Sequence, residues 1–515
     1  MKIFDDILDN YNASKFESEY FARRKISEIK VIEFIGEEIA KSFLAEFGRF
    51  SLREKITTVL ASIGTGHNAA DALAFLYSLS LERKLNVSLL CSDISKLKAN
   101  TKTMLERLKT SCELEILSDE TSIKDSYTLV VEGISAMSYH PPMRPETARR
   151  IRLLNNTNAD VKIAIDIPIG LSDDDENCPV FSADITYATA IAKETLFRIK
   201  NKKFSGRIRY IDANFFENQT NQSQKLIVKP NALTPLSMLR NSLTDKRTFG
   251  KLLIISGSER YAGAALLNAK TAVRAGVGFV YACIGESFKP SFCANEPSVI
   301  WHACQYDEIG ALALENFTQI NALAKNADAI VVGSGLTDSR EALALVGEVL
   351  KANETLPAVI DADAITHSII DVVSKRATPA ILTPHEGEFL RIADNTSDKA
   401  LLECAKSLNC TIMLKSNITR ICDGECIAFS TRGSPALARA GSGDILCALT
   451  ASILANKTIL DVIKAPSDNQ KKICQKVCAM SAQWLGIAAE RASAESGEFA
   501  LSAMEIINYL PKALL

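Results

Sequence analysis

The sequence has no long run of basic residues, and its charges almost cancel. It contains 59 Lys and Arg against 61 Asp and Glu, a formal net charge of -2. Because nucleic acids are held by clustered positive charge, this balance argues against a nucleic-acid partner. No uncharged apolar run reaches the length of a membrane span, and the N-terminus lacks the basic and apolar regions of a signal peptide. We therefore expect a cytoplasmic protein with no membrane partner.

Cysteine pairs with metal-ligand spacing are also absent. The 13 cysteines include no Cys-x-x-Cys pair, which predicts reduced thiols in a reducing compartment. Cys422 and Cys426 are near in sequence, as are Cys474 and Cys478, but neither pair has a nearby His or further Cys. Too few ligands are present for a zinc site, so core packing is the favoured interpretation.

Short apolar runs alternate along the chain with longer helical patterns, which is typical of βαβ units and parallel sheets. At about 150 residues per domain, a chain of 515 residues allows two to four domains. The polar stretch from Phe215 to Gln224 lacks periodicity and indicates a junction between two different α/β domains, at residues 1–217 and 226–515. The predicted strands are Thr57 to Ile63, Val87 to Cys91, Thr128 to Val131, Lys162 to Ile167, Lys251 to Ser256, Ala329 to Gly333, Ala358 to Asp361, Ala380 to Thr383 and Thr411 to Lys415.

A turn of small residues, from Ala440 to Gly443, leads directly to Asp444 and a long apolar helix. Small residues let the backbone approach an anion, and the free N–H groups of a helix start point at it. An aspartate is a poor anion ligand, but it can take a proton from a hydroxyl that then meets a phosphoryl group. The motif predicts phosphate chemistry, with a plain helix N-cap as the alternative.

Four other strand ends in this half carry glycine-rich or polar loops. The loops are Gly257 to Ala265, Val331 to Leu336, Asp361 to Ala364 and Thr383 to Glu388. Because ligands of open α/β sheets bind at the carboxyl ends of strands, this coincidence favours a functional site. Asp361 and Asp363 are candidates for a Mg²⁺ site, and capping or turn roles are the alternative.

In this order, the motifs over about residues 226 to 515 resemble the ribokinase-like domain of ADP-dependent NAD(P)H-hydrate dehydratases. The resemblance implies a repair reaction in which ADP or ATP, with Mg²⁺, phosphorylates the hydroxyl of a hydrated nicotinamide ring. Phosphate is then expelled, and NADH or NADPH is regenerated. Asp444 is the implied base, and the implied hydrate-binding residues are Ala264, Gly335, His385 and Asp444. The implied nucleotide contacts are Lys415, Ser416, Asn417, Ile418, Thr419 and Gly443, with Ser416 standing where the family usually has glycine.

The first half carries a second set of motifs. A glycine turn, Gly64-Thr65-Gly66, follows the first predicted strand and precedes a helical pattern, which is typical of a nucleotide-binding loop. Glu132 and Asp166 each stand at the end of a later strand. Carboxylates at such positions hold a cation or act as a base, and helix capping is the alternative.

Residues from about 26 to 196 resemble the Rossmann-like NAD(P)H-hydrate epimerase domain, which interconverts the two epimers of the damaged cofactor and binds K⁺. The resemblance implies Asp166 as the catalytic residue and substrate contacts at His67, Asn68, Ala69, Ala70, Asp71 and Asp166. It implies a K⁺ site at Asn68, Glu132 and Ile169. The sequence departs from the family here, since three loop glycines are missing, Glu132 replaces Asp and Ile169 replaces Ser. An inactive domain kept for folding or oligomerisation is therefore the alternative to an active epimerase.

Together the two halves predict a bifunctional repair enzyme whose substrates are NADHX and NADPHX. A ribokinase-like kinase acting on a vitamin or sugar alcohol, and a nucleotide-sensing scaffold, are the alternatives. The sequence leaves open the oligomeric state, including a homo-oligomer, and the choice between ADP and ATP.

Overall fold

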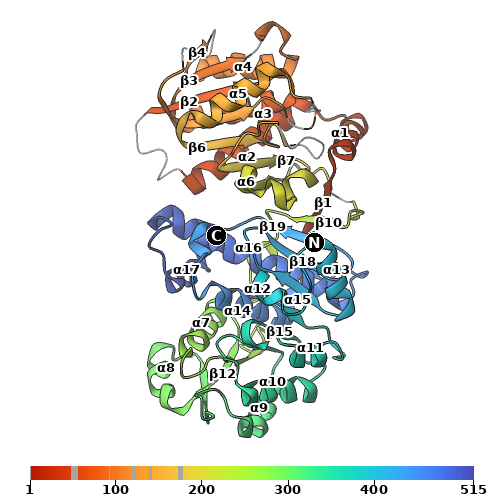
Figure 1. The fold of residues 1–515 in the computed structure, drawn as a ribbon, viewed down its shortest axis with the longest axis vertical. Helices are drawn as coiled ribbons and strands as arrows, with labels where there is room; N and C mark the ends of the chain where they lie inside the picture. The colour runs from red at the N-terminus through yellow and green to blue at the C-terminus, as the bar shows by residue number, and fades with distance from the viewer. Residues whose placement is uncertain are drawn as a thin grey trace. The chain divides into compact units, whose positions relative to one another are not determined.

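The protein is described by a computed structural model that covers residues 2–47, 56–91, 93–117, 123–135, 137, 142–171, 178–217 and 219–515. The chain divides into two compact units (Figure 1). We call Asp5–Pro230 the N-terminal unit and Asn231–Leu515, together with residues 2–4, the C-terminal unit.

The polar stretch that begins at Phe215 is tied to the N-terminal unit by its aromatic residues. Phe215 stacks on Tyr20 with ring centroids 4.1 Å apart, and Phe216 lies 4.7 Å from Phe16. Both partners belong to α1 (Asn10–Arg24), and Phe215 and Phe216 are buried in the core of this unit. The division between the units therefore falls beyond the stretch that polar composition indicates.

A seven-stranded parallel sheet forms the centre of the N-terminal unit. Its spatial order is β4-β3-β2-β5-β6-β7-β9, which is the order of a classic Rossmann fold extended by one strand. Ligands in such sheets bind where the strand order reverses, which here is between β2 and β5. The strands are β2 (Ile56–Ile63), β3 (Lys84–Cys91), β4 (Glu113–Leu117), β5 (Ser126–Gly133), β6 (Asn158–Ile165), β7 (Ile185–Thr189) and β9 (Arg207–Ile211).

Alternate residues of these strands point to opposite faces of the sheet, as the strand geometry requires. Val59 and Leu129 belong to the core beneath α2 (Glu28–Phe47), α3 (His67–Glu82) and α4 (Ala99–Ser111). Leu60 and Val130 belong to a separate core with α5 (Pro145–Asn156). The unit thus has three layers. A short parallel pair, β1 (Phe4–Leu8) with β8 (Ala192–Lys193), aligns Leu8 with Lys193, and α6 spans Lys202–Ser205.

The C-terminal unit contains seven parallel strands in the order β13-β12-β11-β14-β15-β16-β17, followed by β18 and β19, which pair antiparallel. The strand order reverses between β11 and β14. The strands are β11 (Lys251–Ile255), β12 (Phe279–Gly285), β13 (Ile300–Cys304), β14 (Ala329–Val332), β15 (Ala358–Ile360), β16 (Ile381–Leu382), β17 (Thr411–Leu414), β18 (Thr419–Cys422) and β19 (Ile427–Ser430). Strand β10 (Lys225–Val228) belongs to the N-terminal unit.

Helices α7 (Ala262–Arg274), α14 (Ser442–Ala455) and α16 (Gln470–Ser496) pack together, with α14 also contacting the central strands. Helix α14 is almost entirely buried beyond its first turn, and the hydroxyl groups of Thr450 and Ser452 in that part donate to carbonyls of the same helix. The remaining helices are α8 (Lys289–Asn295), α9 (Phe317–Ala324), α10 (Arg340–Ala352), α11 (His367–Val373), α12 (Glu386–Phe389), α13 (Asp398–Ser407), α15 (Lys457–Ile463) and α17 (Ala503–Tyr509).

All nine strands predicted from the sequence are present, with their ends shifted by a few residues. All 13 cysteines are free thiols, as predicted. Within the described ranges, no single helix is both long and apolar enough to cross a membrane, although the bent pair α14 and α15 meets both criteria jointly.

Candidate active sites

Asp444 stands in the first turn of α14, at the carboxyl edge of the sheet in the C-terminal unit. The helix can begin there because Gly441 takes the left-handed conformation, with φ of 93°, which glycine adopts at little cost. Burial and the neighbouring Asp361 raise the pKa of Asp444 to about 6, although Lys415 and a hydrogen bond from Ser334 act in the opposite direction. A carboxyl group with this pKa can accept a proton near neutral pH.

The carboxylate of Asp361 is fully engaged by protein groups. Ser334 Oγ donates to Oδ2 over 3.2 Å, while Thr383 Oγ1 and Lys415 Nζ donate to Oδ1 over 2.7 and 2.8 Å. Asp363 accepts from the Thr337 amide over 2.9 Å. Asp361 is only 1% exposed, so its oxygens do not fit a Mg²⁺ ligand role. Within the described part of the chain, no group of three or more His, Cys, Asp or Glu is arranged to hold a metal ion.

Lys415 continues this network toward His385. Its Nζ lies 3.8 Å from Glu388 Oε2, and Glu388 Oε1 lies 3.2 Å from His385 Nε2. Burial lowers the pKa of Lys415, but Asp361 and Glu388 outweigh that effect and raise it. Lys415 is therefore a fixed positive charge. The His385 ring also caps α12, since Nδ1 accepts from the Glu388 amide over 3.2 Å.

Close backbone contacts bring other predicted residues to this site. A Cβ placed on Gly335, whose φ is 66°, would lie 2.9 Å from Tyr261 Cβ and 3.0 Å from Ala264 Cβ. A Cβ on Gly443 would lie 3.4 Å from Lys415 Nζ. Lys415 thus stands directly against the start of α14, where a phosphoryl group would meet both its charge and the free amides.

Of the predicted nucleotide contacts, Ser416 to Ile418 form the turn between β17 and β18, and Thr419 is the first residue of β18. Ser416 is not among the residues with positive φ, so a side chain is tolerated where the family usually has glycine. Its hydroxyl donates to Asn417 Oδ1 over 3.1 Å. Ile418 is 6% exposed, which leaves its backbone, rather than its side chain, to face a ligand.

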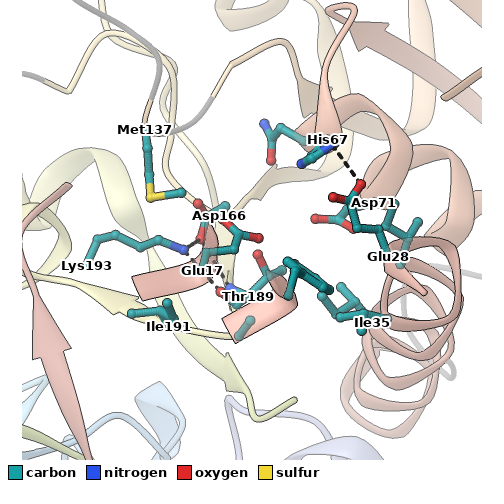
Figure 2. A pocket seen from close by; sticks show the side chains of 15 residues that line it. Glu17, Glu28, Ile35, His67, Asp71, Met137, Asp166, Thr189, Ile191 and Lys193 are labelled. Atoms are coloured by element: carbon teal, nitrogen blue, oxygen red, sulfur yellow. Dashed lines mark hydrogen bonds and ion pairs between the residues drawn. The ribbon is translucent and has the colours of Figure 1, made fainter. Parts of the chain in front are cut away.

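In the N-terminal unit, several predicted residues line one pocket (Figure 2). His67, Asn68 and Asp71 come from the first turns of α3, and Asp166 follows β6. Ala69 and Ala70 do not line this pocket, because their side chains are completely buried in the core on the other side of α3. The full lining is Glu17, Phe21, Glu28, Val31, Ile32, Ile35, His67, Asn68, Asp71, Met137, Asp166, Thr189, Ala190, Ile191 and Lys193.

Asp166 forms a buried ion pair with Lys193. Lys193 Nζ donates to Asp166 Oδ1 over 2.5 Å and to the Thr189 carbonyl over 3.1 Å, and the two charged side chains are 3% and 5% exposed. The Thr189 amide donates to the same Oδ1 over 3.3 Å. Asp166 has φ of 66°, a left-handed conformation that is uncommon for residues other than glycine but enriched in Asp and Asn. This strain at a strand end is typical of functional sites.

Two further polar side chains in the pocket lack partners. Both amide atoms of Asn68, and Asp71 Oδ1, are buried without a hydrogen bond to any described residue. Burial raises the pKa of Asp71 far above its usual range, and Glu17 and Asp166 add to the effect. Unsatisfied buried groups cost free energy, so their presence here indicates that a polar ligand completes them.

Glu132 is held by backbone amides rather than by a cation. Ile134 N donates to Oε1 over 2.7 Å and Ile169 N donates to Oε2 over 3.1 Å. Burial raises the pKa of Glu132 to about 8 despite these donors. Ile169 thus directs its N–H group at Glu132, and its apolar side chain has no oxygen to offer a cation. With Asn68 as the remaining candidate, this donor set does not fit K⁺.

Two family models match the chain. One, described as NAD(P)H-hydrate dehydratase, matches residues 252–512, which is about half of the chain. The chain belongs to the NAD(P)H-hydrate dehydratase family. The other, described as YjeF-related protein N-terminus, matches residues 28–195.

Curated relatives of this dehydratase-family chain match nearly its whole length. The bifunctional NAD(P)H-hydrate repair enzyme of Thermofilum pendens is 28% identical over 88% of this chain and 86% of its own length. The enzyme of the same name from Moorella thermoacetica is 25% identical over 95% of this chain and 93% of its own. Among solved structures, an ADP/ATP-dependent NAD(P)H-hydrate dehydratase from Bacillus subtilis is 24% identical, covers 55% of this chain and 95% of its own, and has a TM-score of 0.43.

Sequence reasoning missed several residues of the two sites in this dehydratase-family chain. Ser334 stands between Gly333 and Gly335 in one predicted loop, and Glu388 lies in another. Their partners in the site, Asp361 and Lys415, come from distant segments of the chain. Lys193 belongs to a two-residue strand with no pattern of its own. Only the folded structure shows that this lysine is buried beside Asp166.

Proposed function

We propose that this chain repairs hydrated NADH and NADPH. Its C-terminal unit dehydrates the hydrate in an ADP- or ATP-dependent reaction, and its N-terminal unit interconverts the two epimers. Family membership supports the first activity, and the match to the second family model supports the coupling. The single observation that carries the dehydratase assignment is Asp444, which combines a position at a helix start with a pKa of about 6.

In the dehydration reaction, Asp444 takes the proton of the ring hydroxyl as the phosphoryl group is transferred. The amides at the start of α14 and the Lys415 ammonium stabilise the negative charge that develops on that group. Ala264 and Gly335 leave room for the flat nicotinamide ring, and His385 borders the same network. Expulsion of phosphate then restores the ring double bond.

In the epimerisation reaction, the pocket around Asp166 and Lys193 holds the hydrate. The unpartnered Asn68 and Asp71 offer hydrogen bonds to polar groups of the substrate, such as its amide and hydroxyl. The hydrogen bond from Lys193 fixes the orientation of the Asp166 carboxylate. An active epimerase is therefore favoured over a structural remnant, although three loop glycines of the family are missing.

The nucleotide supplies the phosphoryl group, and Mg²⁺ accompanies its phosphates. Lys415, the turn from Ser416 to Thr419, and Gly443 are the residues that we assign to it. The choice between ADP and ATP and a cytoplasmic location stay predictions from the sequence.

The decisive test supplies purified protein with a mixture of both hydrate epimers and ADP or ATP. Recovery of dihydronicotinamide absorbance and release of inorganic phosphate are followed together. We expect complete conversion by the wild type and a loss of about 100-fold or more in Asp444→Asn, because a positioned base is removed. Glu386→Gln, an exposed neighbour of His385, serves as the control and keeps the wild-type rate.

Other outcomes would identify different functions. A stable phosphoester with no recovered NADH points to a small-molecule kinase. A halt after one epimer is consumed contradicts the epimerase assignment, whereas an unchanged rate in Asp444→Asn contradicts the role of that residue.

A further inference from the structure

Glu17 is a pocket residue that lies outside both matched families' ranges, since the N-terminal match begins at residue 28. It comes from α1 and lines the same pocket as Asp166 and Lys193 (Figure 2). Within the described ranges it has no hydrogen-bond partner. Two features hold α1 in place: Leu8, just ahead of it, pairs with Lys193, and Phe16 packs on Phe216.

Asp166 and Glu17, two of the four acids that line this pocket, have different partners. Asp166 Oδ1 already accepts from Lys193 and from the Thr189 amide, so these donors fix its orientation. Glu17 has no such partner, and burial raises its pKa; Asp166 and Glu28 add to the rise, while Lys193 and His67 oppose it. A carboxyl group with a raised pKa and no hydrogen-bond partner is free to exchange a proton with a ligand in the pocket.

We propose that Glu17 is a catalytic residue of the epimerisation reaction, where it exchanges a proton with the ring hydroxyl. This inference rests on the proposed epimerase function. Asp166 and Lys193 then hold the substrate, and the Asp166 carboxylate stabilises positive charge on the ring. Asn68 and Asp71, which are buried and unpartnered, complete the polar contacts to the substrate.

The step balances without any oxidant or reductant. Glu17 gives a proton to the hydroxyl oxygen, the C–O bond breaks with its electron pair on oxygen, and water leaves. The lone pair of the ring nitrogen stabilises the carbon that becomes cationic. A water molecule forms the new C–O bond on the opposite face and returns a proton to Glu17. One solvent oxygen therefore enters the product at each inversion.

The test uses the full-length protein, a single hydrate epimer and no nucleotide. Appearance of the other epimer is followed by chromatography, and incorporation of ¹⁸O from labelled water by mass spectrometry, each corrected for the rate without protein. We expect Glu17→Gln to lower kcat by about 100-fold or more with little change in KM, as removal of a proton-transfer group does. Glu17→Asp, which keeps the carboxyl group, retains part of the activity.

Glu19→Gln is the matched control, because Glu19 belongs to the same helix but its side chain is 67% exposed, and we expect no change in rate. The pH profile separates chemistry from structure: Glu17→Asp keeps the pH dependence of the wild type, whereas Glu17→Gln loses the limb that Glu17 contributes. Asp71, Asp166, Lys193, His67 and Glu28 also face Glu17, and their limbs persist in both variants.

An unaltered kcat in Glu17→Gln, or product without solvent ¹⁸O, would overturn the proposal. Failure of the wild type to exceed the uncatalysed rate would instead contradict the epimerase function itself. If Glu17→Gln unfolds the N-terminal unit, Glu17→Asp decides: partial activity with the wild-type pH dependence supports the proposal, and full activity without the limb that Glu17 contributes refutes it.

Discussion

Lys415 donates a hydrogen bond to Asp361 over 2.8 Å, and these two charges act in opposite directions on the pKa of Asp444. Asp361 raises that pKa and Lys415 lowers it. The ion pair therefore sets the pH at which Asp444 becomes a base, without either residue being the base.

Asp361→Asn should move the acidic limb of the dehydratase profile to lower pH. A carboxylate base is lost when it is protonated, so the wild-type rate should fall as the pH drops through about 6. The variant removes a negative charge that raises the pKa of Asp444 and keeps the Lys415 charge that lowers it. Rates measured from acidic to neutral pH check this shift. Asp371→Asn, an exposed change in α11, should leave the limb in place, and an upward shift in Asp361→Asn would contradict the prediction.

Gly441→Ala should destabilise the C-terminal unit and lower the dehydratase rate. The φ of 93° costs about 1–2 kcal/mol for a residue with a Cβ, and that Cβ would lie 2.8 Å from Leu267 Cδ1. The start of α14, and Asp444 with it, must then shift. Chemical denaturation and initial rates measure both effects.

The matched change Gly347→Ala should have the opposite effect on stability. Gly347 lies inside α10, and its Cβ would meet only Ile369 Cδ1, at 3.6 Å. Alanine is the better helix former by about 0.5–1 kcal/mol, so a small stabilisation is expected with no change in rate. Equal effects at both glycines would show that the conformation at Gly441 is not what matters.

Lys193→Met should destabilise the N-terminal unit by about 3–5 kcal/mol, because it leaves the Asp166 carboxylate buried without its counter-ion. Denaturant unfolding measures this loss, and Lys30→Met, at an exposed position of α2, is the control. The double variant Lys193→Met with Asp166→Asn should recover part of the stability. If the double variant is less stable than Lys193→Met alone, the ion pair is not the source of the effect.

Glu132 should make the stability of the N-terminal unit fall as the pH rises. Its folded-state pKa of about 8 lies above the ordinary value of 4.5, so the folded protein binds a proton that the unfolded chain releases between these values. The stabilisation is complete below pH 4.5 and is lost as the pH rises through about 8. Between pH 6 and 8, the free energy of unfolding should fall by about 2–3 kcal/mol from this group.

Glu132→Gln should remove most of this pH dependence, which denaturation at the two pH values will test. Glu113→Gln, whose side chain is 69% exposed on β4, should retain the wild-type slope. A slope that persists in Glu132→Gln would assign the proton uptake to another buried acid, such as Asp71.

The strands and the helix that carries Asp444 could be predicted from the sequence because their signals are local. Short apolar runs bounded by glycine or polar loops mark strands, and the small-residue turn before Asp444 marks a helix start. The residues that tune the sites could not be predicted in this way. Lys193 meets Asp166, and Glu17 joins them, only through segments far apart in the chain.

Two further differences have simple physical causes. Ala69 and Ala70 belong to the loop motif that predicts substrate contacts, but the helix begins at His67 and its turn directs both side chains into the core. The carboxylate of Asp361 is of the type that binds a metal ion, yet three groups from other strand ends donate hydrogen bonds to its oxygens. The substrate contacts implied at Ala69 and Ala70 stay a prediction.

The left-handed backbone at Asp166 limits which substitutions can be interpreted. Asparagine and glycine accept φ of 66° with little strain, whereas a β-branched residue does not. A saturation library at position 166, sorted by protein abundance and by turnover, should therefore separate into two groups. Asn and Gly variants lose the Lys193 ion pair but keep the backbone conformation, so they should be inactive and more abundant than the Val, Ile and Thr variants, which lose both. Only the first group measures the chemistry of the carboxylate.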